Sequence, residues 1–347
     1  MPATKAYAAP SVAAPLAPWT FERREPGAHD LHLELFFCGI CHSDIHQARD
    51  EWGGSRFPMV PGHEIVGRVI RVGAAVTKFK AGDLAGVGCM VDSCRECGPC
   101  KQGLEQFCEK GAAFTYNGTE MDRKTRTQGG YASDLVVDEA FGLKIREGAD
   151  LAGVAPLLCA GITTWSPLRH WKVGKGSRVG VVGLGGLGHM GVKLAASLGA
   201  EVTVLSTSPS KEQGARRLGA HGFALTSDRA SFKKLRGAFD LILDTASAPH
   251  DYNAYLGTLR VDGTMVLLGV PPGPTPVAAF SLIGGRRSLS GSSIGGIAET
   301  QEMLDWCADH KIVADVEVIP ASKINEAYER TIKGDVRYRF AIDLKTL

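Results

Sequence analysis

Four closely spaced cysteines carry the strongest chemical signal in the chain. They are Cys94, Cys97, Cys100 and Cys108, in the pattern Cys-x-x-Cys-x-x-Cys-x₇-Cys. Four thiolates within one short segment match the ligand set of a closed tetrahedral Zn²⁺ site, which cross-links a loop and does no chemistry. An iron–sulfur cluster is the alternative, although the spacing lacks the Cys-Pro ending of bacterial ferredoxins. Unligated cysteines are a third alternative.

Three more residues of metal-binding type lie far apart in the sequence, and spacing alone does not join them. They are Cys41, His63, which precedes Glu64, and Cys159. Taken separately, each has an ordinary structural explanation. A lone histidine is more often a core or surface residue than a ligand, and a buried cysteine often behaves as a small hydrophobic side chain.

A glycine-rich turn in the stretch from Arg178 to Lys211 predicts a dinucleotide site. The pattern G-x-G-x-x-G consists of Gly183, Gly185 and Gly188, with Gly186 and Leu187 between the last two. An apolar, β-rich run precedes it, and helical spacing followed by a second strand comes after it. These glycines permit a tight turn, the approach of a pyrophosphate to the backbone, and close helix–strand packing. The helix N-terminus offers N–H groups to the phosphates. A chance tight turn is the alternative.

The end of the second strand favours NADP(H) over NAD. An NAD site usually has an acidic residue there to hold the ribose 2′-OH. This chain has Ser206, followed by Thr207, Ser208 and Lys211. Three hydroxyls and one ammonium group suit a 2′-phosphate, and no carboxylate is present to repel it. The alternative is a solvated loop whose serine caps the next helix.

Length and composition indicate a two-domain cytoplasmic protein. A chain of 347 residues exceeds the size at which single cores stop growing, and its net charge of +2 argues against a nucleic-acid partner. No apolar run of about 18 residues predicts a membrane span. Residues 1–18 lack the charged and apolar regions of a signal peptide. The nine cysteines are clustered, which favours metal ligands over disulfides.

The elements that must position these residues change in character near residue 154. Residues 1–153 are β-rich, with alternating strands such as Asp30–Leu35 between Gly and Pro turns, which predicts a barrel-like core. Residues 154–293 alternate strands with helices, as in a doubly wound parallel sheet. The expected strands are Val179–Val182, Glu201–Leu205, Phe223–Thr226, Leu241–Asp244, Thr264–Leu268 and Ser288–Gly291, and the expected helices are Met190–Leu198, Ser210–Leu218, Ser231–Leu235 and Tyr252–Leu259. Two further helix–strand units within 294–347 exceed this six-stranded sheet, and we expect them to return to the first domain.

The order of these motifs resembles that of the zinc-dependent medium-chain alcohol dehydrogenases. The matching segments are Cys41-His42-Ser43-Asp44, Gly62-His63-Glu64, the four-cysteine lobe, the Cys159 segment and Gly183–Gly188. The resemblance spans nearly the whole chain and is closest to the cinnamyl alcohol dehydrogenase group, including its bacterial NADP-dependent aldehyde reductases. That detail rests on Val60–Gly67, Gly129–Ala132, Pro156–Pro167, Gly180–Gly191 and Asp335–Phe340. The resemblance implies an α/β fold with a Rossmann domain (154–293) and a GroES-like catalytic domain (1–153 and 294–347) that holds both zinc sites.

The resemblance also implies a catalytic zinc. Cys41, His63 and Cys159 would be its three protein ligands, leaving one position open for water or substrate. Glu64 would act as a transient ligand or as a neighbour of the ligands. Asp44 would accept the other ring N–H of His63 and fix its tautomer. The alternative for Asp44 is a favourable charge at a helix N-terminus.

The family's proton relay and cofactor contacts transfer to further positions. Ser43 matches the relay hydroxyl and His46 the histidine at its outer end, with a helix cap and a surface histidine as the alternatives. The implied cofactor contacts are His42, Thr163, Gly269, Val270 and either Arg337 or Arg339. Trp52 and Met90 match pocket-wall positions, with core packing as the equal alternative. No function is assigned to Cys38, Cys89 or Cys307.

These observations imply an NADP(H)-dependent, zinc-dependent alcohol dehydrogenase that acts mainly as an aldehyde reductase. A wall of Trp and Met favours aromatic or long apolar aldehydes over polyols. The alternatives are a polyol dehydrogenase, a reductase of iminium or conjugated alkene groups, and a catalytically silent protein that senses zinc or NADPH. The family expectation is a homodimer formed through the edge of the cofactor domain near Gly284–Ile294.

Overall fold

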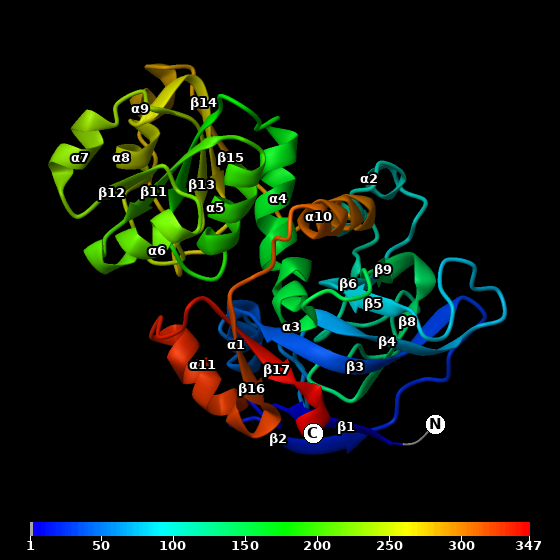
Figure 1. Cartoon of the computed structure of the whole chain (residues 1–347). Helices are drawn as coiled ribbons and strands as arrows, with labels where there is room; N and C mark the ends of the chain where they lie inside the picture. Colours follow the sequence, from blue (N-terminus) through cyan, green and yellow to red (C-terminus); the bar gives the residue numbers. More distant parts are fainter. Residues whose placement is uncertain (1–2) are drawn as a thin grey trace. The chain divides into compact units, whose positions relative to one another are not determined.

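The computed structural model describes residues 3–347, which form two compact units (Figure 1). The first unit contains the described residues up to Cys159 together with Gly295–Leu347, and the second contains Ala160–Ile294. The observed division therefore differs from the expected boundary near residue 154. Residues of η3 (Ala155–Leu158) are buried, and Leu158 contacts the strand glycine Gly86, which keeps this segment in the first unit.

The second unit is built on a six-stranded sheet with the order β12-β11-β10-β13-β14-β15. Every neighbouring pair is parallel, which confirms the expected doubly wound fold. The strands are β10 (Arg178–Val182), β11 (Glu201–Ser206), β12 (Gly222–Leu225), β13 (Phe239–Asp244), β14 (Leu259–Leu267) and β15 (Ser288–Gly291). The helices are α4 (Ala160–His170), α5 (Gly188–Ser197), η4 (Pro209–Lys211), α6 (Glu212–Arg217), α7 (Arg229–Lys234), α8 (Tyr252–Leu256) and α9 (Ala279–Ile283).

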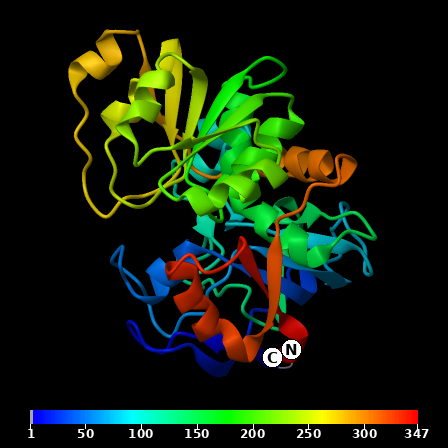
Figure 2. The same ribbon diagram turned by 60° about the vertical axis from the view of Figure 1, so that its left-hand side comes forward.

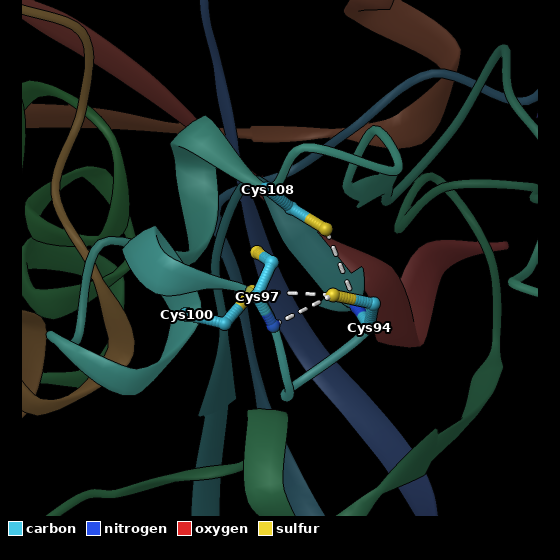
Figure 3. A group of neighbouring side chains, drawn as sticks. All are labelled: Cys94, Cys97, Cys100 and Cys108. Carbon is cyan, nitrogen blue, oxygen red and sulfur yellow. Dashed lines mark hydrogen bonds between the residues drawn. The ribbon is translucent and has the colours of Figure 1, made fainter.

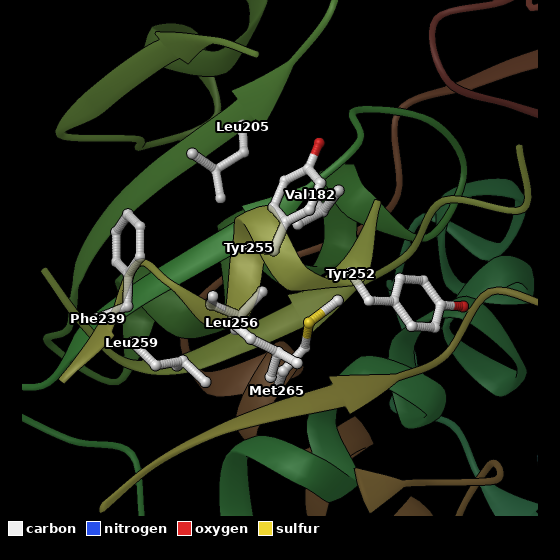
Figure 4. Packing of buried hydrophobic residues seen from close by; sticks show 9 residues of the cluster. Val182, Leu205, Phe239, Tyr252, Tyr255, Leu256, Leu259 and Met265 are labelled. Carbon is white, nitrogen blue, oxygen red and sulfur yellow. The ribbon is translucent and has the colours of Figure 1, made fainter. Parts of the chain in front are cut away.

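Successive strand residues point to opposite sides of the sheet. Because the central strands β10 and β13 carry buried residues on both sides, helices cover both faces. A Cβ on Gly191 of α5 would contact Val181 and Leu243, so α5 lies on that face. Val182 faces the other way, into a cluster that α8 covers. Figure 4 shows this cluster, whose buried members are Val182, Leu205, Phe239, Ile242, Tyr252, Tyr255, Leu256, Leu259 and Met265.

The fifth strand and the helix before it depart from expectation. Strand β14 begins at Leu259 rather than Thr264, and α8 ends at Leu256 rather than Leu259. Leu259 pairs with Phe239 across a register shift in the ladder. Residues 260–262 are exposed, so the start of the strand has no apolar run that sequence patterning detects.

The glycine turn between β10 and α5 has the backbone geometry that the motif predicts. Gly183 has a φ of +86°, which L side chains rarely adopt. A Cβ on Gly188 would lie 2.2 Å from the carbonyl oxygen of Gly183, so the helix start lies directly against the strand end. A Cβ on Gly185 would meet no atom within 4 Å. The turn therefore leaves open space at its middle glycine, as the motif predicts.

The first unit is organised around a seven-stranded sheet with the order β16-β17-β3-β4-β5-β9 and with β8 paired to β3. Its strands are β3 (Asp30–Ile40), β4 (Ile65–Val72), β5 (Leu84–Val87), β8 (Asp134–Asp138), β9 (Leu143–Lys144), β16 (Val316–Pro320) and β17 (Arg339–Asp343). Two hairpins accompany it, β1 (Thr4–Ala8) with β2 (Ala17–Phe21) and β6 (Met90–Asp92) with β7 (Ala113–Phe114). The unit confirms the β-rich first domain.

Helices of the first unit connect and cover these strands. They are α1 (His42–Ala48), α2 (Gly98–Lys101), η1 (Glu105–Phe107), η2 (Glu139–Phe141), α3 (Leu151–Val154), η3, α10 (Ile297–Asp309), η5 (Ala321–Lys323), α11 (Ile324–Ile332) and η6 (Leu344–Thr346). As expected, the last two helix–strand units return here: β17 pairs antiparallel with β3, and the red and blue strands lie side by side (Figures 1 and 2).

Among residues 3–347, no single helix is long and apolar enough to cross a membrane. The segments Leu151–Leu158 and Ala160–His170 meet the length and composition criteria only when they are taken together as a bent pair.

Candidate active site

Cys41, His63, Glu64 and Cys159 come together in the first unit. Their candidate ligand atoms all lie within 4.8 Å of one another, and all four residues are buried. Each ligand sits at the end of an element: Cys41 precedes α1, the His63–Glu64 pair precedes β4, and Cys159 follows η3. The structure thus assembles the dispersed ligand set that sequence spacing alone did not join.

The Asp44 carboxylate contacts two of the residues in this cluster, Cys41 and His63. It accepts hydrogen bonds from the backbone N–H groups of Cys41 (2.9 Å) and Gly62 (3.0 Å) and from the Tyr131 hydroxyl (3.0 Å). Its Oδ1 also lies 3.1 Å from Nδ1 of His63. Because a carboxylate accepts, Nδ1 carries the proton and Nε2 keeps the lone pair that a metal needs. Asp44 also lies in the first turn of α1, so both interpretations of this residue apply.

Glu64 forms a buried ion pair with Arg339, which comes from β17. Arg339 is 5% exposed and Glu64 0%. Glu64 Oε2 has no hydrogen-bond partner within residues 3–347. Burial raises the pKa of Glu64 to about 7, and the charge of Arg339 opposes this shift. Of the two candidate arginines, Arg339 is therefore engaged beside the cluster, whereas Arg337 is exposed.

The donor chemistry of this cluster fits a catalytic zinc. The Sγ atoms of Cys41 and Cys159 are 3.9 Å apart. Their hydrogen bond lowers the pKa of Cys41 well below its ordinary value and raises that of Cys159. Two thiolates and one imidazole would hold the cation, since cysteine binds a metal in its deprotonated form. The unpartnered oxygen of Glu64 beside them suits an occasional fourth ligand.

The four-cysteine lobe forms a second cluster, with its ligand atoms also within 4.8 Å of one another (Figure 3). Cys97 precedes α2, Cys100 lies in it, and Cys108 follows η1. Backbone N–H groups of Cys94, Cys97 and Glu109 donate to the sulfurs of Cys108, Cys94 and Cys97, at 3.4, 3.4 and 3.5 Å. Backbone hydrogen bonds lower the pKa of Cys94 to about 6. Sulfurs that accept N–H groups in this way fit thiolate ligands of a structural zinc.

The predicted cofactor residues lie mostly at the carboxyl end of the parallel sheet. Ser206 ends β11, is buried, and its Oγ accepts the N–H of Ser208 at 3.2 Å. Thr207 is exposed. Lys211 ends η4. The segment therefore presents hydroxyl groups directly after the second strand of the motif.

The remaining cofactor candidates are divided between the two units. Thr163 is buried in α4, and Val270 is 60% exposed just beyond β14. Gly269 donates its N–H to the Asp244 carbonyl at 3.0 Å. His42 opens α1 in the first unit, where burial lowers its pKa.

Family models match both units. An alcohol dehydrogenase GroES-like domain matches residues 27–147, and a zinc-binding dehydrogenase domain matches residues 186–309. The chain belongs to the zinc-binding alcohol dehydrogenase family. The resemblance seen in the sequence is thereby confirmed.

Relatives of this zinc-binding dehydrogenase include "NADP-dependent alcohol dehydrogenase C" of Mycobacterium tuberculosis (strain CDC 1551 / Oshkosh), 55% identical over 347 residues with 100% of both chains covered. "Aldehyde reductase YahK" of Escherichia coli (strain K12) is 52% identical over 345 residues, with 99% of each covered. A solved cinnamyl alcohol dehydrogenase of Sorghum bicolor (SbCAD4) has a TM-score of 0.96 at 43% identity, covering 99% of this chain and 98% of that one. The one from Helicobacter pylori, complexed with NADP(H), has a TM-score of 0.93 at 42% identity, with the same coverage.

The two predicted relay residues of the dehydrogenase lie on α1. The Oγ of Ser43 is 3.6 Å from the Sγ of Cys41, so this hydroxyl adjoins the metal cluster. His46 hydrogen-bonds through Nδ1 to the Glu51 carboxylate and stacks on Trp52, with ring centroids 4.8 Å apart. The side chain of Trp52 is 48% exposed, so Trp52 is not a core residue.

Sequence reasoning missed several residues around the site. Tyr131 bonds to Asp44, the ring of Tyr116 stacks on His63 with centroids 5.7 Å apart, and Glu51 pairs with His46. None of these belongs to a motif with fixed ligand spacing. Tyr131 carried a signal, since it lies in the Gly129–Ala132 segment of the family resemblance, and Glu51 carried a local one, as an acid just after the helix that bears the predicted relay histidine.

The two cysteine clusters predict different phenotypes for matched substitutions. Cys97→Ser and Cys159→Ser should each reduce bound zinc from two ions to one per chain. Both substitutions remove a bound ion that stabilises the folded state, but Cys97→Ser should lower the melting temperature more, because its site closes a loop and has no other role. Elemental analysis and thermal unfolding measure both effects, with Cys307→Ser, outside both clusters, as the control. Native melting of Cys97→Ser would contradict the structural role.

Proposed function

We propose that this zinc-binding dehydrogenase interconverts primary alcohols and aldehydes by hydride transfer with NADP(H), acting mainly as an aldehyde reductase. The observation that carries the proposal is the buried convergence of Cys41, His63 and Cys159, held by Asp44. Two thiolates and one imidazole leave a coordination position open for substrate. The activities in the names of the two bacterial relatives support the same reaction.

Different residues of the chain orient the ligands and supply the proton in this reaction. When bound, zinc polarises the carbonyl oxygen and the reduced nicotinamide supplies the hydride. Asp44 fixes the tautomer and orientation of His63. The product oxygen then needs one proton, which the Ser43 hydroxyl donates. His46, which Glu51 holds on α1, takes up a proton from solvent and replaces the one that Ser43 has donated.

The cofactor site supports a dinucleotide with a 2′-phosphate. Gly183, Gly185 and Gly188, with Gly186 and Leu187, receive the pyrophosphate at the start of α5. Ser206, Thr207, Ser208 and Lys211 receive the 2′-phosphate. Thr163, Gly269 and Val270 contact the nicotinamide. His42 and the exposed Arg337 contact the pyrophosphate, because Arg339 is paired with Glu64.

Aromatic or long apolar aldehydes are the proposed substrate class, because Trp52 and Met90 match pocket-wall positions. The side chain of Trp52 is 48% exposed and is therefore available to a substrate, whereas that of Met90 is 3% exposed, which core packing also explains. A polyol dehydrogenase is the second candidate, since a relative from Fragaria ananassa named "Probable mannitol dehydrogenase" is 50% identical over 331 residues.

Turnover of cinnamaldehyde with NADPH should exceed turnover of mannitol with NADP by a large factor.

Cys159→Ser should abolish aldehyde reduction while leaving NADPH binding intact, because the ligand is lost but the glycine turn is unchanged. Steady-state kinetics and fluorescence titration of NADPH measure the two effects. No turnover of any aldehyde by the zinc-loaded protein, despite NADPH binding, would support the silent sensor instead.

Cofactor preference tests the loop after β11. Ser206→Asp should reduce the preference for NADPH over NADH by about tenfold or more, a change of roughly 1.4 kcal/mol, because its carboxylate repels the 2′-phosphate. Ser206→Asn, of equal size without the charge, is the matched control. The ratio of kcat/KM for the two cofactors is the measurement. Equal ratios in both variants would contradict the role of this loop.

We also propose that the protein is cytoplasmic, because reducing conditions there keep the ligand cysteines as thiols. We further propose a homodimer in which the β15 edges of two copies meet. Strand β15 is one of the two edge strands of the parallel sheet. Phe280 and Ile283 of the preceding α9 are 82% and 69% exposed. An open strand edge beside exposed apolar side chains suits pairing with a second copy.

The mass in solution tests this dimer. Ile283→Asp should shift the dehydrogenase toward monomers, measured by light scattering after size exclusion. Ile332→Asp is the control, since Ile332 is also a large exposed apolar residue, 46% exposed, but lies on α11. A wild-type chain that is monomeric throughout would refute the proposal.

A further inference from the structure

The loop that follows β13 packs against the glycine turn. It runs from Thr245 to Asp251, between β13 and α8. The Thr245 N–H and hydroxyl both donate to the carbonyl of Val182, at 3.1 and 2.7 Å. A Cβ on Gly183 or on Gly188 would lie 3.3 or 3.1 Å from the Thr245 hydroxyl. The loop thus forms one wall of the turn, at the point where strand order reverses and dinucleotides bind.

His250, near the end of this loop, faces two hydrogen-bond acceptors. Its Nδ1 lies 2.8 Å from the carbonyl oxygen of Ala248, and its Nε2 lies 3.0 Å from Oδ2 of Asp244. The Ala248 carbonyl can only accept. Asp244 is 1% exposed, and its Oδ1 accepts the N–H of Ala246 at 3.2 Å, which leaves Oδ2 to face the histidine ring.

Two acceptors require two donors, so the ring that satisfies both is the protonated imidazolium. A neutral imidazole carries a single N–H and loses one of the two bonds. The bond to Ala248 closes the loop on itself, and the bond to Asp244 ties the loop to the end of β13. Protonation therefore decides whether both ties are present.

The groups around the ring favour this charge. Asp244 comes from β13, and Asp251, Tyr252 and Tyr255 come from the start of α8 and its first turns. The two tyrosine rings meet the imidazole edge-on, with centroids 5.0 and 5.3 Å away. Burial lowers the pKa of His250, but the hydrogen bonds to Asp244 and Ala248 outweigh it and raise the pKa above its ordinary value.

We propose that His250 is a positioning residue for the dinucleotide: its protonated ring holds the Thr245–Asp251 loop against the glycine turn, and NADPH binds more weakly when the ring loses its proton. The inference rests on the proposed function, since it concerns the same cofactor site. The contribution is complete below the ordinary histidine pKa and is lost as pH rises through the higher pKa of the folded state.

Fluorescence titration of NADPH from about pH 6 to about pH 9 tests the inference. In the wild-type dehydrogenase Kd should rise about tenfold more over this range than in His250→Gln, whose amide does not titrate. Comparing the two proteins cancels the titration of the cofactor's own phosphate. His310→Gln, an exposed histidine on another unit, should retain the wild-type profile. In His250→Gln, KM for NADPH should change while kcat at saturating NADPH stays close to wild type.

A second measurement uses only the wild-type chain, in case His250→Gln does not fold. The ¹⁵N shifts of the His250 ring should show both nitrogens protonated at neutral pH. A neutral ring at neutral pH, or parallel Kd profiles for wild type and His250→Gln, would overturn the inference. A protein that binds no NADPH at any pH would instead overturn the proposed function.

Discussion

The Asp44 carboxylate joins segments that are far apart in the sequence and sets the positions of the candidate metal ligands. Its two oxygens accept from Cys41, Gly62 and Tyr131 and contact the ring of His63, and the residue is 0% exposed. A buried carboxylate is stable only when such donors surround it, so the ligand loop and the carboxylate each require the other. The geometry of the cluster follows from satisfying this one anion.

A second buried charge makes the cluster depend on the C-terminal part of the chain. Arg339 on β17 pairs with Glu64, and β17 takes its place beside β3 through four paired residues. Removing one partner of such a pair leaves an uncompensated buried charge, at a cost of about 3–5 kcal/mol. Gly39 of β3 leaves the room this carboxylate occupies, because a Cβ there would collide with Oε2 of Glu64. Pairing of β17 with β3 is therefore tied to the electrostatics of the cluster.

The sequence predicts local features well and long-range contacts poorly. The four-cysteine lobe and the Gly183–Gly188 turn are visible because their function depends on short spacings, and the six-stranded sheet follows from its alternating pattern. The Glu64–Arg339 pair spans 275 positions, and no spacing rule connects residues so far apart. The contacts of Tyr131 and His250 likewise depend on where strands end in space. The start of β14 was missed because its first residues after Leu259 face solvent.

The first unit is discontinuous, and this determines the order in which a ribosome can complete the two units. The segment 160–294 leaves the exit tunnel whole and can fold while synthesis continues. The first unit must wait for residues 295–347, because Arg339 and β17 follow the segment 160–294 in the chain. The Cys41, His63 and Cys159 cluster and its supporting Glu64–Arg339 pair can therefore be complete only after the segment 160–294 has been synthesised, although the three residues themselves precede that segment.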